Sequence, residues 1–329
     1  MRFGIIDFIK SQYTKVPPVP QADLSGKTVI VTGANIGLGF EAAKHFARMN
    51  PAKLILACRN REKGDAAVNV IKQETGFQGV ELWLLDLASF ASVKFFSERF
   101  EKEGGRLDIL VENAANAPPM GSVDFTDDGW EASVQINVLS TSLLALLLVP
   151  RMLETAQNEA HYLVLEAPML REYGHKNDLK NTKSDAKRYQ VTKLWNIFFV
   201  RALNDRLHER PVIVNAIHPG YSSSALGHNF MGIHLLLDKL MYIFLARTTE
   251  EGSRMPVWAA VGAEERKDEL RGAYISLMEV HEPSDFVISK EGEKAQEKFW
   301  DNLIEELSQI EPKVTQVVKE SLTPPVTNN

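Results

Sequence analysis

The chain has 329 residues, of which 44% are hydrophobic and 24% charged, and its formal net charge is -6. That length fits one large domain with extensions or two small domains, and the composition is too apolar for a disordered chain. The acidic balance argues against a nucleic-acid partner, because binding a phosphate backbone needs clustered Lys and Arg. The single cysteine, Cys58, excludes a disulfide framework and a zinc site built on paired thiolates, and it favours a reducing, cytoplasmic compartment.

The first 20 residues form an N-terminal lead, which ends in a Pro-rich connector over 16–20. Pro favours an extended backbone there. We expect no secretory signal, because the opening residues are few and carry Arg2, Asp7 and Lys10. The apolar stretch 5–9 is too short to anchor the chain by itself, so we expect it to pack on the domain surface. A peripheral membrane contact and the oligomeric state stay open.

From residue 21 to 283, short apolar runs alternate with helical patterns. The runs are nearly all apolar, which is typical of strands covered on both faces. This rhythm predicts an α/β fold with a Rossmann-type, doubly wound parallel sheet. The expected strands are 28–31, 53–57, 80–84, 109–111, 162–165, 212–216 and 273–276. The expected helices are 38–49, 62–75, 89–102, 130–156, 189–207 and 250–261.

The uncharged run 132–150 nears membrane-spanning length. Its first half is polar, so it predicts a buried helix instead of a transmembrane segment. From residue 284 the alternating rhythm stops, and 284–329 is interpreted as a C-terminal helical extension. Periodic apolar residues predict one amphipathic helix over 291–322 that docks on the domain, and we expect the tail 323–329 to be disordered.

A glycine-rich turn follows the first expected strand and precedes a helix. Glycines allow a tight turn and the close approach of a pyrophosphate to the helix N-terminus, whose N–H groups favour anions. A dinucleotide-binding motif requires this strand–turn–helix context. We therefore expect a dinucleotide cofactor to contact Gly33, Asn35, Ile36, Gly37, Leu38 and Gly39.

The end of the second expected strand indicates which dinucleotide binds. A site that prefers NAD usually has an acidic residue about 20 positions after the glycines, where it binds the ribose 2′-hydroxyl. Arg59 stands at that place. A guanidinium forms forked bonds with a 2′-phosphate, so the sequence predicts NADP(H).

Tyr189 and Lys193 are four residues apart on an expected helix and therefore share a face. A phenol has a pKa of about 10 and is a poor acid or base near neutral pH. We expect the Lys193 ammonium, beside an oxidised nicotinamide, to lower the pKa of Tyr189 and to hold the ribose hydroxyls. The pair predicts proton transfer at a carbonyl or an alcohol.

Together these motifs resemble the short-chain dehydrogenase/reductase superfamily over about residues 24–282, most closely its fungal retinol-dehydrogenase-like members. The resemblance implies an oxidoreductase, with a role in secondary metabolism. It implies that Asn137 is catalytic and holds a water on a proton path from Lys193. It adds a set of cofactor contacts, namely Asp86, Leu87, Asn113, Ala114, Pro219, Gly220 and Ser222.

One position departs from the pattern of that superfamily, which has a Ser at the end of the fifth strand to bind the substrate carbonyl. Ala167 stands there, directly after Glu166. Losing one such donor typically costs about 10²–10³ in rate. Glu166 itself offers a catalytic acid or base at the mouth of the cleft, unless it pairs with Arg171 or Lys176 on the following loop.

Three functions fit the sequence, and the fold does not choose among them. The first is an NADP(H)-dependent oxidoreductase acting on a carbonyl or alcohol of a lipophilic small metabolite, bound by an apolar substrate lobe over 222–247. The second is a non-redox isomerase, dehydratase or cyclase that uses Glu166 and Tyr189. The third is a non-catalytic NADP(H)-binding protein. The scattered histidines show no metal-ligand spacing, so we expect no metal site.

Overall fold

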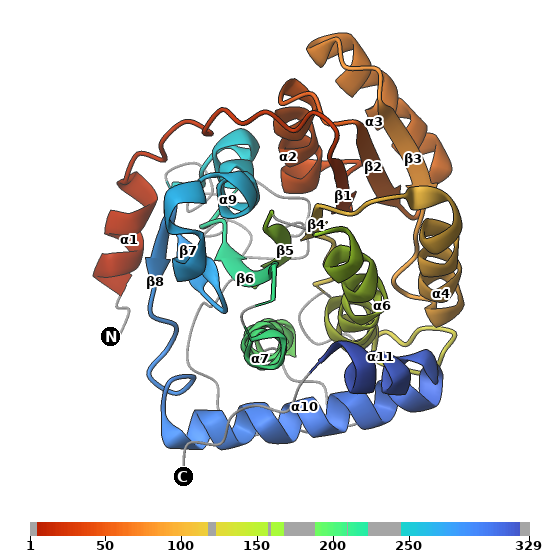
Figure 1. The fold of residues 1–329 in the computed structure, drawn as a ribbon. Helices are drawn as coiled ribbons and strands as arrows, with labels where there is room; N and C mark the ends of the chain where they lie inside the picture. Colours follow the sequence, from red (N-terminus) through yellow and green to blue (C-terminus); the bar gives the residue numbers. More distant parts are fainter. Residues whose placement is uncertain are drawn as a thin grey trace.

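The structure is a computed structural model that describes residues 5–117, 123–156, 159–167, 188–208, 210–222 and 245–322. Side chains are described from residue 9 onward. Within these ranges the chain forms a central sheet with helices on both faces (Figure 1).

The central sheet has eight strands in the order β3-β2-β1-β4-β5-β6-β7-β8. All neighbouring strands are parallel except β7 and β8, which are antiparallel. The sheet therefore confirms the predicted Rossmann-type fold, with a switch in strand order between β1 and β4. The strands are β1 Thr28–Thr32, β2 Lys53–Cys58, β3 Val80–Leu84, β4 Ile109–Glu112, β5 His161–Glu166, β6 Val212–His218, β7 Tyr274–Ser276 and β8 Glu279–His281.

The edge strand β8 is the one strand that the sequence did not predict. It is short and all three of its residues are exposed, so it carries no apolar pattern. The turn before it places Leu277 and Met278 at φ 54° and 61°, in the left-handed region. Hairpin turns of this kind usually carry Asn and Gly, so Leu and Met gave no turn signal.

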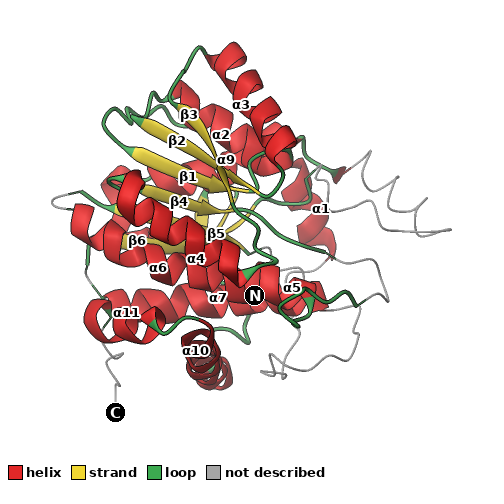
Figure 2. Cartoon of the chain, turned by 90° about the vertical axis from the view of Figure 1, so that its right-hand side faces the viewer, coloured by secondary structure: helices red, strands yellow, loops and turns green. Residues whose placement is uncertain are grey.

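Helices lie in layers on the two faces of the sheet (Figure 2). One apolar cluster joins the sheet to α2, α3 and α9, and the other joins it to α4, α6 and α7. The helices are α1 Ile5–Tyr13, α2 Gly37–Arg48, α3 Arg61–Thr75, α4 Phe90–Arg99, α5 Ala132–Val134, α6 Ser140–Thr155, α7 Arg188–Leu207, α9 Thr249–Val261, α10 Lys290–Ile310 and α11 Lys313–Ser321. Three short helical segments of other types are present: η1 Phe100–Gly104 and η2 Gln135–Leu139 are π-helical, and η4 Glu264–Leu270 is a 3-10 segment kinked at Arg266.

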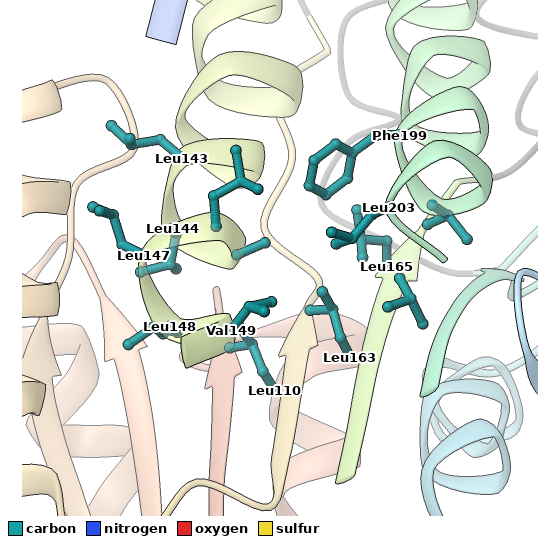
Figure 3. Packing of buried hydrophobic residues seen from close by; sticks show 14 of the residues in the cluster. Leu110, Leu143, Leu144, Leu147, Leu148, Val149, Leu163, Leu165, Phe199 and Leu203 are labelled. Atoms are coloured by element: carbon teal, nitrogen blue, oxygen red, sulfur yellow. The ribbon is translucent and has the colours of Figure 1, made fainter. Parts of the chain in front are cut away.

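The apolar run that includes α6 is a core helix. Val149 of α6 lies beside Leu110 of β4, while Leu143 and Leu147 extend from the side of α6 that faces away from Phe199 of α7 (Figure 3). The helical run Ala132–Thr155 has the length and hydropathy of a membrane span, but 89% of its most apolar window is buried in the fold. The predicted buried helix is therefore confirmed.

The C-terminal extension forms two helices, whereas the sequence predicted one. Glu311 adopts extended angles after α10, and Pro312 precedes α11, because proline has no N–H with which to continue a helix. Phe299 and Trp300 of α10 stack on Trp195 and Phe199 of α7 at centroid distances of 5.9 and 6.2 Å. The extension therefore forms a third layer that braces α7 from outside (Figure 1). The tail 323–329 lies outside the described residues.

The N-terminal lead is tied to the far end of the domain. The amide N–H of Tyr221 donates to Oε1 of Gln12 at 3.2 Å, and Nη2 of Arg247 donates to the carbonyl of Ser11. Gln12 is buried, while Ile9 and Tyr13 are exposed. Residues 11 and 12 of the lead therefore contact the domain, whereas the side chains of residues 5–8, for which packing on the domain surface is predicted, lie outside the described residues.

Candidate active site

A cleft of about 750 Å³ opens at the carboxyl ends of the central strands, where ligands of doubly wound sheets bind. Most of its walls come from the loops that follow β1, β2, β3 and β4, and one residue comes from the end of β5. Among its lining residues are Gly33, Asn35, Ile36, Gly37, Leu38, Arg59, Asn60, Lys63, Asp86, Leu87, Asn113, Ala114, Ala115, Asn116 and Glu166.

The glycine-rich turn has the geometry of a phosphate cradle. Gly33 and Gly37 have φ of 65° and 68°, which favour glycine. A Cβ on Gly37 would meet nothing within 4 Å, whereas a Cβ on Gly39 would lie 2.4 Å from Nδ2 of Asn113. Helix α2 begins at Gly37 without a side-chain cap, so its first N–H groups are free to bind an anion. These features fit the pyrophosphate of a dinucleotide, with Gly39 packed beneath the turn and Gly37 facing open space.

Thr32 at the end of β1 holds this turn against the loop after β4, a role that the sequence analysis missed. Its hydroxyl accepts from the backbone N–H groups of Asn113 and Ala114 at 2.9 and 3.0 Å. Nδ2 of Asn113 returns a bond to the Thr32 carbonyl at 3.0 Å. These partners are far apart along the chain, so only the parallel pairing of β1 with β4 reveals them.

Two cations lie at the β2 end of the cleft. Arg59 follows β2 as predicted, and Lys63 lies one turn later on α3, where the sequence analysis overlooked it. The side chain of Asn60 caps α3 by accepting from Lys63 N–H at 2.8 Å. Across the cleft, Oδ1 of Asp86 accepts from Ala88 N–H at 2.9 Å, which fixes the loop that carries the predicted cofactor contacts Asp86 and Leu87.

Tyr189 and Lys193 lie on the first turns of α7, and Lys193 is almost completely buried. The Lys193 ammonium donates to the backbone carbonyl of Glu166 at 2.9 Å and lies 5.5 Å from the centroid of the Tyr189 ring. Burial lowers the pKa of Lys193, and the negative charge of Glu166 acts in the opposite direction by raising it. Burial, together with Glu166, raises the pKa of Tyr189. In the protein alone, burial is the largest cause of this shift, and it opposes the lowering that the Tyr–Lys spacing predicts beside an oxidised nicotinamide.

Asn137 lies within the irregular turn η2, directly before α6. Its Oδ1 accepts from Asn116 N–H at 2.7 Å, and its Nδ2 donates to the Asn116 carbonyl and to Oγ1 of Thr192 at 2.8 and 3.1 Å. Thr192 in turn donates to the Tyr189 carbonyl at 2.7 Å. Asn137 therefore connects the loop after β4 to the helix of Tyr189, and both N–H donors of its amide are used in these bonds.

A buried ion pair sits next to Tyr189 and was not predicted. Nε of Arg188, the first residue of α7, lies 2.7 Å from Oε2 of Glu131, which precedes α5. The two side chains are 11% and 8% exposed, so the pair is shielded from solvent. It joins the start of the Tyr189 helix to the segment that carries Asn137. The two residues are distant in sequence, and neither belongs to a motif.

The end of β5 presents Glu166 and Ala167 in different surroundings. Glu166 lines the cleft. Burial raises the pKa of its carboxyl, whereas the Lys193 ammonium lowers that pKa by a smaller amount. Ala167 is fully buried in the apolar cluster on the α7 side of the sheet, and its N–H donates to the Ile217 carbonyl at 2.9 Å. The candidate partners Arg171 and Lys176 lie outside the described residues.

The predicted contacts after β6 form a separate group that does not line the cleft. Gly220 has φ 79°, and a Cβ on it would lie 2.5 Å from Nη1 of Arg247. Oγ of Ser222 donates to the Pro219 carbonyl at 3.0 Å. A Cβ on Gly252 would lie 2.4 Å from Oγ of Ser222 and 2.7 Å from Cδ2 of Leu38, which places Ser222 near the lip of the cleft. Most of the predicted substrate lobe, 223–244, lies outside the described residues.

Comparisons with known proteins agree with this geometry. Residues 27–161 match the family described as short chain dehydrogenase. A short chain dehydrogenase/reductase of Cryptosporiopsis sp. is 36% identical over 329 residues, which span 94% of this chain and 98% of the relative. A short-chain dehydrogenase of Penicillium roqueforti is 35% identical, covering 93% of this chain and 84% of its own length.

Among solved structures, that of L-sorbose reductase from Gluconobacter frateurii, complexed with NADPH and L-sorbose, is similar in fold. Its TM-score is 0.60 at 22% identity, over 78% of this chain and 96% of that one. With relatives aligned over nearly their whole length and the sheet order in place, the chain belongs to the short-chain dehydrogenase/reductase family.

Proposed function

We propose that the protein is an NADP(H)-dependent oxidoreductase that acts on a carbonyl or alcohol of a lipophilic small metabolite. The observation that carries the proposal is the meeting of α7 with β5 at the cleft. There Lys193, beside Tyr189, donates to the backbone of Glu166, and Glu166 lines the same cleft as the glycine-rich turn. A titratable phenol and ammonium thus lie next to a nucleotide-binding site, as a hydride-transfer enzyme requires.

The preference for NADP(H) is supported by the charges beside β2. Arg59 and Lys63 both line the cleft at the start of α3. A 2′-phosphate binds favourably to two cations near a helix N-terminus, whereas an unphosphorylated ribose gains little from them. The acidic residue that NAD sites usually offer after the second strand is absent from that position, which Arg59 occupies.

Each residue has a defined task in this reaction. When bound, the reduced cofactor supplies a hydride to the carbonyl carbon. Tyr189 donates its phenolic proton to the carbonyl oxygen, and its raised pKa keeps the phenol protonated before the hydride arrives. Lys193 holds the backbone of β5 and places its positive charge beside the phenol. Asn137 and Thr192 fix the turn of α7 on which Tyr189 lies.

The proposed substrate class rests on the apolar segment 222–247 and on the resemblance of the sequence to retinol-dehydrogenase-like enzymes. The role of the protein in secondary metabolism and its cytoplasmic location remain predictions, and its oligomeric state remains open.

The test is incubation of the purified protein with a panel of apolar ketones and aldehydes, with NADPH and with NADH. We expect NADPH absorbance to fall and the product to gain two hydrogens by mass. The variant Tyr189→Phe should bind NADPH normally and stop turnover. NADPH binding without turnover across the panel would support the non-catalytic alternative instead.

A second candidate function is supported by Glu166, a buried carboxyl in the cleft near Tyr189. A carboxyl and a phenol in one site can act as acid and base in an isomerase, dehydratase or cyclase, which moves protons without net redox change. A product formed at constant NADPH absorbance would identify this function.

A further inference from the structure

The missing serine raises the question of which group binds the oxygen of the substrate. Position 167 cannot supply a hydroxyl, and its side chain is fully buried in the apolar cluster under α7. The neighbouring side chain, Glu166, lines the cleft and is 8% exposed. Of the two residues at this strand end, only Glu166 combines a polar side chain with a place in the cleft wall.

We propose, on the basis of the proposed function, that Glu166 acts as a neutral carboxylic acid that donates a hydrogen bond to the carbonyl oxygen of the substrate. It thereby takes the place of the hydroxyl expected at position 167. In this role Glu166 orients and polarises the carbonyl, while Tyr189 remains the proton donor.

The surroundings of Glu166 favour its neutral form. Burial raises the pKa of the carboxyl. In the described part of the chain, the titratable groups beside it are Lys193, which lowers its pKa, and Tyr189, whose own pKa Glu166 raises, both on α7. The hydrogen bond that Lys193 makes to residue 166 goes to the backbone carbonyl. The direction of this shift favours the neutral acid, and a carboxylic acid held neutral in an apolar site is an effective donor to an oxyanion.

The atoms and charges balance with this assignment. In the reduction, the carbonyl carbon accepts the hydride from NADPH, and the π electron pair moves to the oxygen. The oxygen then takes the proton of Tyr189. Glu166 keeps its own proton throughout and is unchanged at the end of the cycle, so only the phenol must be reprotonated from solvent.

The experiment compares Glu166→Gln with Glu166→Ala, because glutamine keeps an N–H donor at nearly the same place and alanine keeps none. NADPH-dependent turnover of a ketone that the wild type reduces is followed by absorbance. We expect kcat to fall less than about 10-fold in Glu166→Gln and about 10²–10³-fold in Glu166→Ala. Circular dichroism and NADPH binding verify that both variants fold. Equal loss in the two variants would overturn the proposal, because it would show that the proton of Glu166 itself is transferred.

A second readout does not depend on activity. The infrared spectrum of the wild type near neutral pH should contain the C=O band of a protonated carboxylic acid that Glu166→Gln lacks. The variant Glu112→Gln is the matched control, because Glu112 is another buried carboxyl whose pKa burial raises. An unchanged band in Glu166→Gln would overturn the proposal even where turnover agrees with it. If the wild type consumes no NADPH with any carbonyl, the proposed function fails, and this inference fails with it.

The pH dependence gives a third distinction. The wild-type rate should fall as the pH rises through the raised pKa of Glu166, since ionisation removes the donor. Glu166→Gln has no proton to lose and should keep a flatter alkaline limb. A limb that is identical in the two proteins would assign the titration to Tyr189 or Lys193 and count against the proposal.

Discussion

The carboxylate of Asp108 ties together the starting ends of three adjacent strands, on the edge of the sheet opposite the cleft. It accepts from Thr28 N–H of β1 at 2.8 Å and from Nη2 of Arg106 at 2.5 Å. Nε2 of His161, the first residue of β5, lies 3.3 Å from its Oδ1. Asp108 is itself 2% exposed. We predict that Asp108→Asn destabilises the fold, because it removes the charge on which these contacts converge.

The size of the effect follows from the pKa of this carboxyl. Burial raises the pKa of Asp108, but the hydrogen bonds from His161, Arg106 and Thr28 outweigh burial and lower the pKa from 3.8 to about 2. At about 1.4 kcal/mol per pKa unit, this shift stabilises the folded state by about 2 kcal/mol. The pKa is lower in the folded than in the unfolded state, so the stabilisation is complete above pH 3.8 and is lost as the pH falls through about 2. About half of it should remain near pH 3.

Urea unfolding of the wild type and Asp108→Asn, followed by circular dichroism at several pH values, measures this contribution. The difference in free energy of unfolding should be about 2 kcal/mol at pH 7 and should shrink between pH 4 and pH 3. Asp301→Asn, at an exposed position on α10, is the control and should change stability by less than about 0.5 kcal/mol. A difference that stays constant from pH 7 to pH 3 would refute the reasoning, because it would then not arise from the charge.

Five further variants test the site. Arg59→Ala should weaken NADPH binding about 10- to 100-fold and leave NADH binding nearly unchanged, as measured by cofactor fluorescence. Tyr189→Phe should abolish turnover with NADPH binding intact, whereas Lys193→Ala should damage both, which separate turnover and binding titrations would show. Glu131→Gln breaks the buried ion pair beside Tyr189, so kcat should fall more than KM rises, and the melting temperature should drop. Ala167→Ser should not raise kcat, and it should cost about 1–3 kcal/mol in urea unfolding, because the new hydroxyl enters an apolar cluster.

The parts of the fold that the sequence predicted are those with a local signal. The apolar runs of the seven long or buried strands and the glycines of the first turn lie within short windows, and both depend on local backbone and burial rules. The parts it missed are a hairpin without the usual turn residues and a helix break at one proline. The β8 hairpin turns through Leu277 and Met278, and the break before α11 comes from a proline inside an otherwise continuous apolar period.

The site shows the same division, and the division has a consequence for mechanism. Tyr189 and Lys193 are visible in the sequence because one helix turn brings them together, but Thr32 and the Glu131–Arg188 pair join distant segments and carry no motif. At the end of β5 a motif-based reading looks for a hydroxyl at residue 167, whereas packing buries that side chain and leaves Glu166 in the cleft wall. The substitution at position 167 therefore removes a hydroxyl from a side chain that packing buries, while the neighbouring Glu166 supplies the polar group in the cleft wall. The chemistry available at this strand end then depends on whether the Glu166 carboxyl is neutral, and burial favours that state.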